Sequence, residues 1–126
     1  MATTKEILRV LRNELQFLDR GGYGCPILWR SARIFEDSPT CRKDRWSACP
    51  HGDCVLLEFV PERSRHEAIP CRHIPLNESG ETLDTLYSTG TNQEIQATLR
   101  EWLLRTIARL ERVTQAEMPW SHEKAS

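Results

Sequence analysis

Cysteines accompanied by prolines in the middle of the chain most constrain what it can fold into. Four of the five cysteines lie in one turn-rich stretch: Cys41, Cys49, Cys54 and Cys71. A proline stands within two positions of three of them: Pro39, Pro50 and Pro70. Because proline fixes φ and bends regular structure, these thiols are presented on kinked backbone and could gather around one ion. Long amphipathic helices are expected only outside this stretch.

The four thiols are candidate zinc ligands. Structural zinc takes four tetrahedral ligands, commonly thiolates, and Cys49 and Cys54 form a pair at the wide end of the usual spacing. Seven residues separate Cys41 from Cys49, enough for the loop to fold back. His51 and His73 lie close to these thiols in sequence and are the substitutes for one of them. The chain has no CxxC pair, so the pattern matches no standard zinc finger.

Three other interpretations of the cysteines stay open. Cysteine is among the most buried residue types, and Cys54 and Cys71 both have apolar neighbours typical of a core. An iron–sulfur cluster also takes four thiolates, although the ferredoxin spacing is absent. A disulfide, for instance Cys49 with Cys71, requires an oxidising compartment. Cys25 lies far from the others in sequence and is treated as a spare thiol.

An amphipathic pattern predicts a first helix from residue 4 to about residue 19. Thr3 and Glu6 have the spacing of a capping box, and Gly21-Gly22 ends the helix because glycine readily adopts the left-handed conformation of a C-cap. Apolar residues at helical spacing form one face: Ile7, Leu8, Leu11, Leu15 and Leu18.

A second capping box, Thr91 with Glu94, predicts a helix that continues to about residue 114. Its expected apolar face consists of Ile95, Leu99, Trp102, Leu103, Leu110 and Val113. The tail that follows, residues 118–126, is expected to fray.

Between the two helices the sequence favours short strands. Residues 27–35 and 54–60 are rich in bulky apolar side chains, and residues 67–74 fit an edge strand because Pro70 cannot donate to a sheet. Residues 81–87 fit a short helix or an extended piece. The order helix, strands, helix predicts an α+β fold: a small antiparallel sheet with N- and C-terminal amphipathic helices packed on it and a Cys-rich loop region in the middle.

The 126 residues are typical of a single domain. We expect it to comprise an N-terminal helix, a Cys-containing strand and loop region, a C-terminal helix and a flexible tail: residues 1–20, 23–76, 91–114 and 118–126. The net charge of −1 gives no global attraction for nucleic acid or an anionic membrane. No apolar stretch reaches the length of a membrane span, and the first residues lack a signal-peptide pattern. A cytoplasmic protein is expected.

Four residues are candidates for contact with a partner: Trp46, Arg105, Arg109 and Arg112. Trp46 lies in the polar loop between Cys41 and Cys49, and tryptophan is enriched at binding hot spots. The three arginines lie on one stripe of the last helix. This stripe is either an ordinary solvated face or a patch that binds an anion. The leading hypothesis is a non-enzymatic, zinc-stabilised interaction or accessory module with a protein partner. A thiol or iron–sulfur redox or metal sensor is the alternative. A cysteine- or metal-dependent enzyme ranks last, because no motif names a reaction.

Overall fold

The computed structural model describes residues 3–24, 33–36, 40 and 54–116. Within these residues the chain forms three α-helices: α1 (Thr4–Asp19), α2 (Leu83–Thr89) and α3 (Asn92–Ala116). Short 3-10 turns fill much of the rest: η1 (Gly22–Gly24), η3 (Val55–Phe59), η4 (Glu62–Ser64) and η5 (Pro70–His73). None of the described helices combines the length and apolarity of a membrane span.

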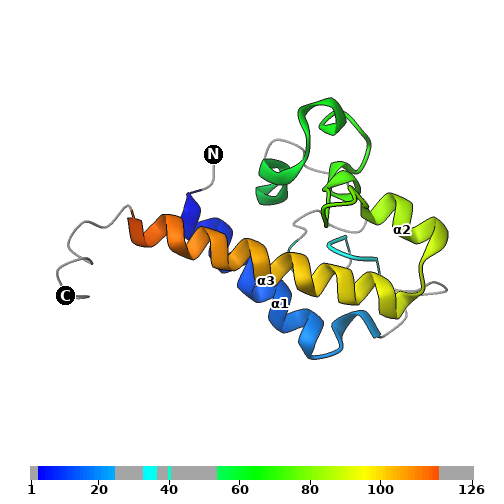
Figure 1. The fold of residues 1–126 in the computed structure, drawn as a ribbon, viewed down its shortest axis with the longest axis horizontal. Coiled ribbons are helices and arrows are strands. Elements are labelled where there is room, and N and C mark those ends of the chain that lie inside the picture. Colours follow the sequence, from blue (N-terminus) through cyan, green and yellow to red (C-terminus); the bar gives the residue numbers. More distant parts are fainter. Residues whose placement is uncertain (1–2, 25–32, 37–39, 41–53, 117–126) are drawn as a thin grey trace.

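The scaffold is the pair α1 and α3, which pack side by side and run in opposite directions (Figure 1). Two ion pairs define their register. Arg12 Nη2 lies 2.6 Å from Glu111 Oε2, and Arg100 Nε lies 3.0 Å from Asp19 Oδ1. As residue numbers rise along α1, those of their α3 partners fall, as an antiparallel pair requires. All four side chains are about half exposed, so these ion pairs add little stability.

Both helices begin at the caps expected from the sequence. The N–H of Glu6 donates to Thr3 Oγ1 at 3.2 Å, and α1 ends before Gly21, whose φ is +81°. At the start of α3 the N–H of Thr91 donates to Glu94 Oε1 at 2.8 Å, and the N–H of Glu94 donates to Thr91 Oγ1 at 3.2 Å. The hydrogen bond from the backbone of Thr91 holds the pKa of Glu94 below its usual value.

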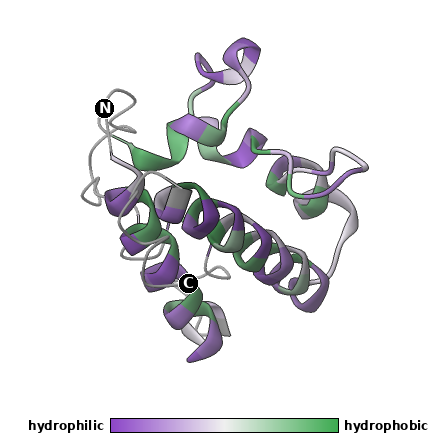
Figure 2. Ribbon diagram, turned by 60° about the vertical axis from the view of Figure 1, so that its left-hand side comes forward, coloured by the Kyte–Doolittle hydropathy of each residue, from purple (hydrophilic) through white to green (hydrophobic). Residues whose placement is uncertain are grey.

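The core lies where the apolar faces of α1 and α3 meet the segment 54–86. Figure 2 shows these faces as green stripes turned toward the interior of the molecule. The two helices contribute Ile7, Leu8, Leu11 and Leu18 from α1 and Ile95, Leu99, Trp102, Leu103 and Ile107 from α3. Most of the predicted apolar face of α3 is therefore buried. Val113 is the exception: it is 40% exposed and lies beyond Leu110, which is still partly buried.

The predicted antiparallel sheet is wrong, because the described part of the chain contains helices and turns without a strand. Residues 54–60, expected as the clearest strand, form η3 instead. The N–H of Leu57 donates to Cys54 O at 3.1 Å, and the N–H of Val60 donates to Leu57 O at 3.1 Å. Leu56 and Val60, four residues apart, are both buried. The run therefore satisfies its backbone groups through local hydrogen bonds between residues three apart, as a 3-10 turn does.

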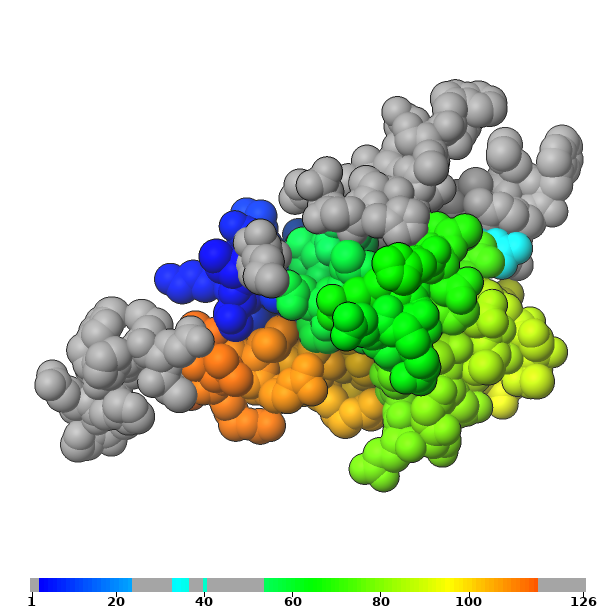
Figure 3. Space-filling model, turned by 90° about the horizontal axis from the view of Figure 1, so that it is seen from above, coloured from blue at the N-terminus to red at the C-terminus, as the bar shows by residue number. Residues whose placement is uncertain are grey.

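The other expected strands differ in the same way. Residues 67–74 form a turn and η5, which begins at Pro70, a position that tolerates the missing N–H. Of residues 27–35, only 33–35 are described, and Ile34 and Phe35 lie in a turn. Residues 83–89 form α2, one of the two alternatives for that stretch. The segment from η3 to α2, green to yellow-green in Figure 3, covers one side of the helix pair. Since the described residues form only helices and turns, their architecture is helical and not α+β.

Candidate functional site

The structure describes two of the four predicted zinc ligands. Cys54 precedes η3 and Cys71 lies in η5, two elements that contact each other. Both cysteines are half-buried and pack against the hydrophobic core, as the core interpretation expects. His73, a substitute ligand, is half-buried in η5. Among the described residues, no three His, Cys, Asp or Glu side chains form a cluster that could hold a metal ion.

The remaining candidates for this site lie outside the described residues: Cys25, Cys41, Cys49, His51 and Trp46. Convergence of the four thiols is therefore untested. The zinc site stays a prediction from the sequence, and so does the role of Trp46.

A groove along α3 brings the three candidate arginines together. Arg105, Arg109 and Arg112 form one side of it, and the chain from Pro75 to Glu78 forms the other. Trp102 and Thr106, both buried, lie at its base with Leu76. The groove is open to solvent and has a volume of about 540 Å³. We call it the arginine groove.

A hydrogen bond ties the two sides of the arginine groove together. Arg105 Nη2 donates to the carbonyl oxygen of Leu76 at 2.6 Å. The side chain of Leu76 is fully buried, and its N–H donates to Glu81 O at 2.8 Å. Arg105 is therefore held on a backbone that is itself anchored in the core. The guanidinium carries five N–H donors, so this contact leaves donors for a ligand.

The charge of the arginine groove is predominantly positive. The described residues of its lining contribute the three guanidinium groups and one carboxylate, that of Glu78. Arginine stays protonated at all physiological pH values and offers planar, paired donors suited to carboxylates and phosphates. The lining can therefore bind an anionic group, and its arginines cannot act as general acid or base.

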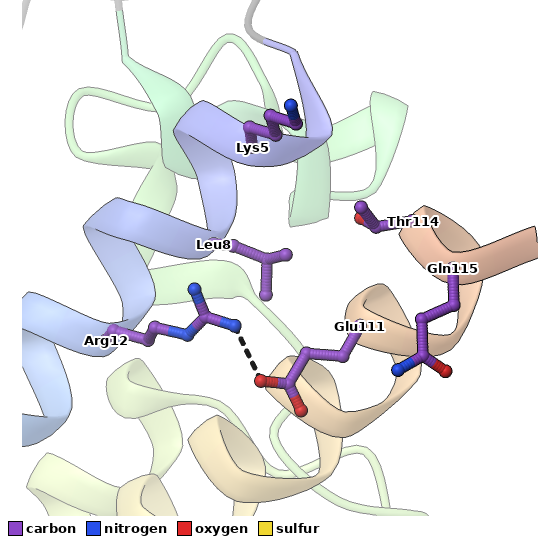
Figure 4. A pocket seen from close by; sticks show the side chains of 6 residues that line it. All are labelled: Lys5, Leu8, Arg12, Glu111, Thr114 and Gln115. Carbon is purple, nitrogen blue, oxygen red and sulfur yellow. Dashed lines mark hydrogen bonds and ion pairs between the residues drawn. The ribbon is translucent and has the colours of Figure 1, made fainter. Parts of the chain in front are cut away.

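A second pocket lies between the beginning of α1 and the end of α3 (Figure 4). Lys5, Leu8 and Arg12 project into it from α1, facing Glu111 and the polar side chains near the end of α3. Arg12 is paired with Glu111 across the opening. Among the described residues that line this pocket, Arg12 is already paired with Glu111, so Lys5 is the one charge left to select a ligand, against three arginines in the arginine groove.

Two sequence segments that are far apart meet around Tyr87 of α2. Arg72 donates to Glu36 through Nε at 2.8 Å and Nη2 at 3.0 Å, a bidentate ion pair. This hydrogen bonding raises the pKa of Arg72. The guanidinium carbons of Arg33 and Arg72 lie 5.3 Å and 5.8 Å from the centre of the Tyr87 ring, within cation–π range. The cluster fixes residues 33–36 against η5 and α2.

Tyr87 also accepts a hydrogen bond, from the N–H of Ile34 at 3.0 Å. Burial raises the pKa of Tyr87 to about 12, from 10.0 for an ordinary tyrosine. Because the folded-state pKa is raised, the stability that the neutral Tyr87 side chain gives to the folded protein is complete below pH 10 and is lost as the pH rises toward 12.

Replacing Tyr87 with phenylalanine is therefore expected to remove part of the alkaline loss of stability. The wild type loses stability between about pH 10 and pH 12 because the unfolded chain ionises its tyrosine first. Urea denaturation midpoints of the wild type and Tyr87→Phe should differ at pH 8 and converge above pH 10. The difference between the two midpoints at each pH cancels the contributions of other groups that titrate in this range, such as lysines. Midpoints that stay a constant distance apart would contradict the raised pKa.

A buried carboxylate on α1, that of Glu14, accepts hydrogen bonds from two hydroxyls that lie between α1 and η3 in the sequence. Glu14 is 1% exposed on α1. One of its oxygens accepts from the Tyr23 hydroxyl, and the other accepts from the Thr40 hydroxyl at 2.5 Å. The Tyr23 oxygen in turn accepts from the N–H of Phe35 at 2.9 Å. Sequence analysis missed this network, although a glutamate in register with the buried Ile7, Leu11 and Leu18 was a signal for it.

Comparison of the chain with protein-family models, with curated proteins and with solved structures gave no match. Of the residues predicted to contact a partner, the structure gathers Arg105, Arg109 and Arg112 on one groove.

Proposed function

We propose that this protein is a non-enzymatic interaction module that binds a protein partner in the arginine groove. The observation that carries the proposal is the placement of Arg105, Arg109 and Arg112 on one side of a groove whose other side is bonded to Arg105. Arginine is enriched at binding hot spots. The antiparallel pair of α1 and α3 supplies a rigid base for these side chains.

The chemistry of the lining favours binding over catalysis. Thr106 is the hydroxyl among the lining residues, and it is 3% exposed. Among the described residues, the lining includes no histidine or cysteine and has Glu78 as its one carboxylate. Nucleophilic catalysis needs an activated nucleophile with an adjacent base, and this groove instead offers fixed positive charge.

Site-specific photo-crosslinking tests the proposed function. A photoreactive amino acid replaces Ala108, a groove residue, and a matched variant carries it at Arg9, an exposed position on α1. In cells that express the protein, Ala108 should give a discrete adduct that Arg9 does not give. The adduct should disappear when Arg109 and Arg112 are changed to glutamate. Equal labelling from both positions, or an adduct insensitive to the charge reversal, would refute docking in the groove.

The proposal includes a zinc ion held by Cys41, Cys49, Cys54 and Cys71, with His51 or His73 as a substitute ligand. It is supported by the sequence pattern and by the placement of Cys54 and Cys71 at contacting elements. Metal binding of this kind contributes directly to folding.

Native mass spectrometry of the reduced protein is expected to detect one zinc per chain, lost on replacement of Cys41 and Cys49 by serine. Chelation should lower the melting temperature of the wild type and leave that of the double variant unchanged. A metal-free wild type with a melting temperature insensitive to chelator would remove zinc from the proposal without affecting the arginine groove. A visible absorption band would point to the iron–sulfur alternative.

A further inference from the structure

The charge and spacing of the side chains that line the arginine groove indicate the kind of segment that binds there. We propose that its ligand is an extended acidic peptide segment of the partner, with Asp or Glu side chains at alternate positions. This inference rests on the proposed function, because it assumes that the groove is a docking site. It adds the conformation and charge pattern of what docks there.

The spacing of the arginines supports an extended ligand. Arg105, Arg109 and Arg112 are four and then three residues apart on α3. At a rise of about 1.5 Å per residue, the first and last Cα atoms are separated by about 10 Å along the axis. An extended peptide rises about 3.3 Å per residue and turns alternate side chains to one side. Alternating carboxylates are about 6.6 Å apart, which is within about 2 Å of the intervals of about 6 Å and 4.5 Å between the arginine Cα atoms, and the long arginine side chains can take up this difference.

The three arginines have complementary roles in holding such a segment. Arg105 is fixed by its hydrogen bond to Leu76 O, so its remaining donors present a pre-oriented contact with little further loss of side-chain entropy. Arg109 and Arg112 are exposed and can turn toward carboxylates on either side. Paired N–H donors on each guanidinium bind a carboxylate in bidentate fashion.

A nucleic acid fits the same groove less well. Binding of single strands combines positive charge with aromatic rings on which bases stack. Within the described part of the chain, Trp102 is the one aromatic residue that lines the groove, and it is 7% exposed, so its ring is not presented as a stacking platform. A long nucleic acid, with a charge on every phosphate, would also meet a protein surface with a net charge of −1, whereas a short peptide contacts only the positively charged groove. These observations favour a short acidic peptide over RNA.

The test measures binding of three fluorescein-labelled probes to the full-length protein by fluorescence anisotropy. The probes are a peptide with four glutamates alternating with glycine, the same peptide with glutamine for glutamate, and a single-stranded oligouridine. We expect the glutamate peptide to bind about tenfold more tightly than the glutamine peptide, with affinity that falls as salt is raised.

Two double variants with the same change in net charge complete the design. The first double variant, Arg109→Glu with Arg112→Glu, reverses two charges in the groove. The second, Arg9→Glu with Arg63→Glu, reverses two charges at exposed positions outside the groove lining. The first should weaken the glutamate peptide at least about tenfold, and the second about twofold or less. Arg109→Gln with Arg112→Gln should give an intermediate loss. Circular dichroism melting checks that each variant is folded.

The outcomes separate this inference from the proposed function. Equal binding of the glutamate and glutamine peptides, or tighter binding of oligouridine than of the glutamate peptide, would overturn the acidic ligand. Equal weakening by the two charge-reversal variants would also overturn it, because the groove would then contribute only net charge. In each case a groove-specific crosslink from Ala108 would leave the interaction module standing with a different ligand.

Discussion

Replacing Phe35 with alanine is expected to lower the free energy of unfolding by about 3–5 kcal/mol, the usual cost of truncating a buried phenylalanine. Phe35 is fully buried and packs edge-on against Trp102, with ring centroids 6.2 Å apart. It therefore joins the turn 34–36 to the apolar face of α3. The change leaves a cavity that the helix pair cannot readily close.

Replacing Phe35 with glycine instead of alanine tests the backbone conformation of this residue. Phe35 has a φ of +63°, a left-handed conformation that side chains with a Cβ disfavour by about 1–2 kcal/mol. Phe35→Gly removes the same ring but relieves this strain, so it is expected to be at least as stable as Phe35→Ala. The opposite order is expected at Leu11, a buried residue within α1, where glycine costs about 1 kcal/mol more than alanine.

Urea denaturation of the four single variants measures both differences. The wild type provides the reference, and equal m-values establish that the unfolding transitions are comparable. If Phe35→Gly were less stable than Phe35→Ala by the margin seen at Leu11, residue 35 would not adopt the left-handed conformation.

Glu14→Gln is expected to cost about 2–4 kcal/mol, because it replaces one of two accepting oxygens in a buried network by a group with two N–H donors. Both hydroxyls, of Tyr23 and Thr40, donate to the carboxylate. An amide can accept from one of them through its oxygen, and then its NH₂ faces the other hydroxyl. Glu14→Leu, which removes all polar atoms at this position, should cost at least as much, because both hydroxyls lose their acceptor.

A double-mutant cycle with Tyr23→Phe identifies the cause of this loss. If the hydrogen bond between Tyr23 and Glu14 is responsible, the combined variant should lose less than the sum of the single losses, by about 0.5–3 kcal/mol. Glu58→Gln, at an exposed position on η3, is the matched control and should change stability by less than about 0.5 kcal/mol. Strict additivity of Glu14→Gln and Tyr23→Phe would mean that the two side chains do not interact.

The helices could be predicted because their signals are local. The N-cap at Thr3, the capping box at Thr91, and apolar residues three and four positions apart lie within single segments of sequence. The same periodicity placed Arg105, Arg109 and Arg112 on one stripe. What it could not supply was the opposite wall of the groove, because the contact from Arg105 to Leu76 joins residues 29 positions apart.

The sheet was predicted wrongly because strand propensity was read without a partner strand. The apolar run from Cys54 to Val60 suits a strand by composition, yet in the structure it packs as η3. The ion pair between Arg72 and Glu36 and the network around Glu14 were also beyond reach, since each depends on pairings 9 to 36 positions apart. The position of Glu14 on an apolar face was a hint of burial, but it named no partner.

The two hydroxyls on Glu14 have a consequence for how the chain is held together. Tyr23 and Thr40 are distant in sequence, yet both donate to one carboxylate on α1. The Tyr23 oxygen also accepts from the N–H of Phe35, so a single side chain links three separate points of the chain to that helix. Loss of the Glu14 carboxylate should therefore release all three points together, and one substitution would act like several.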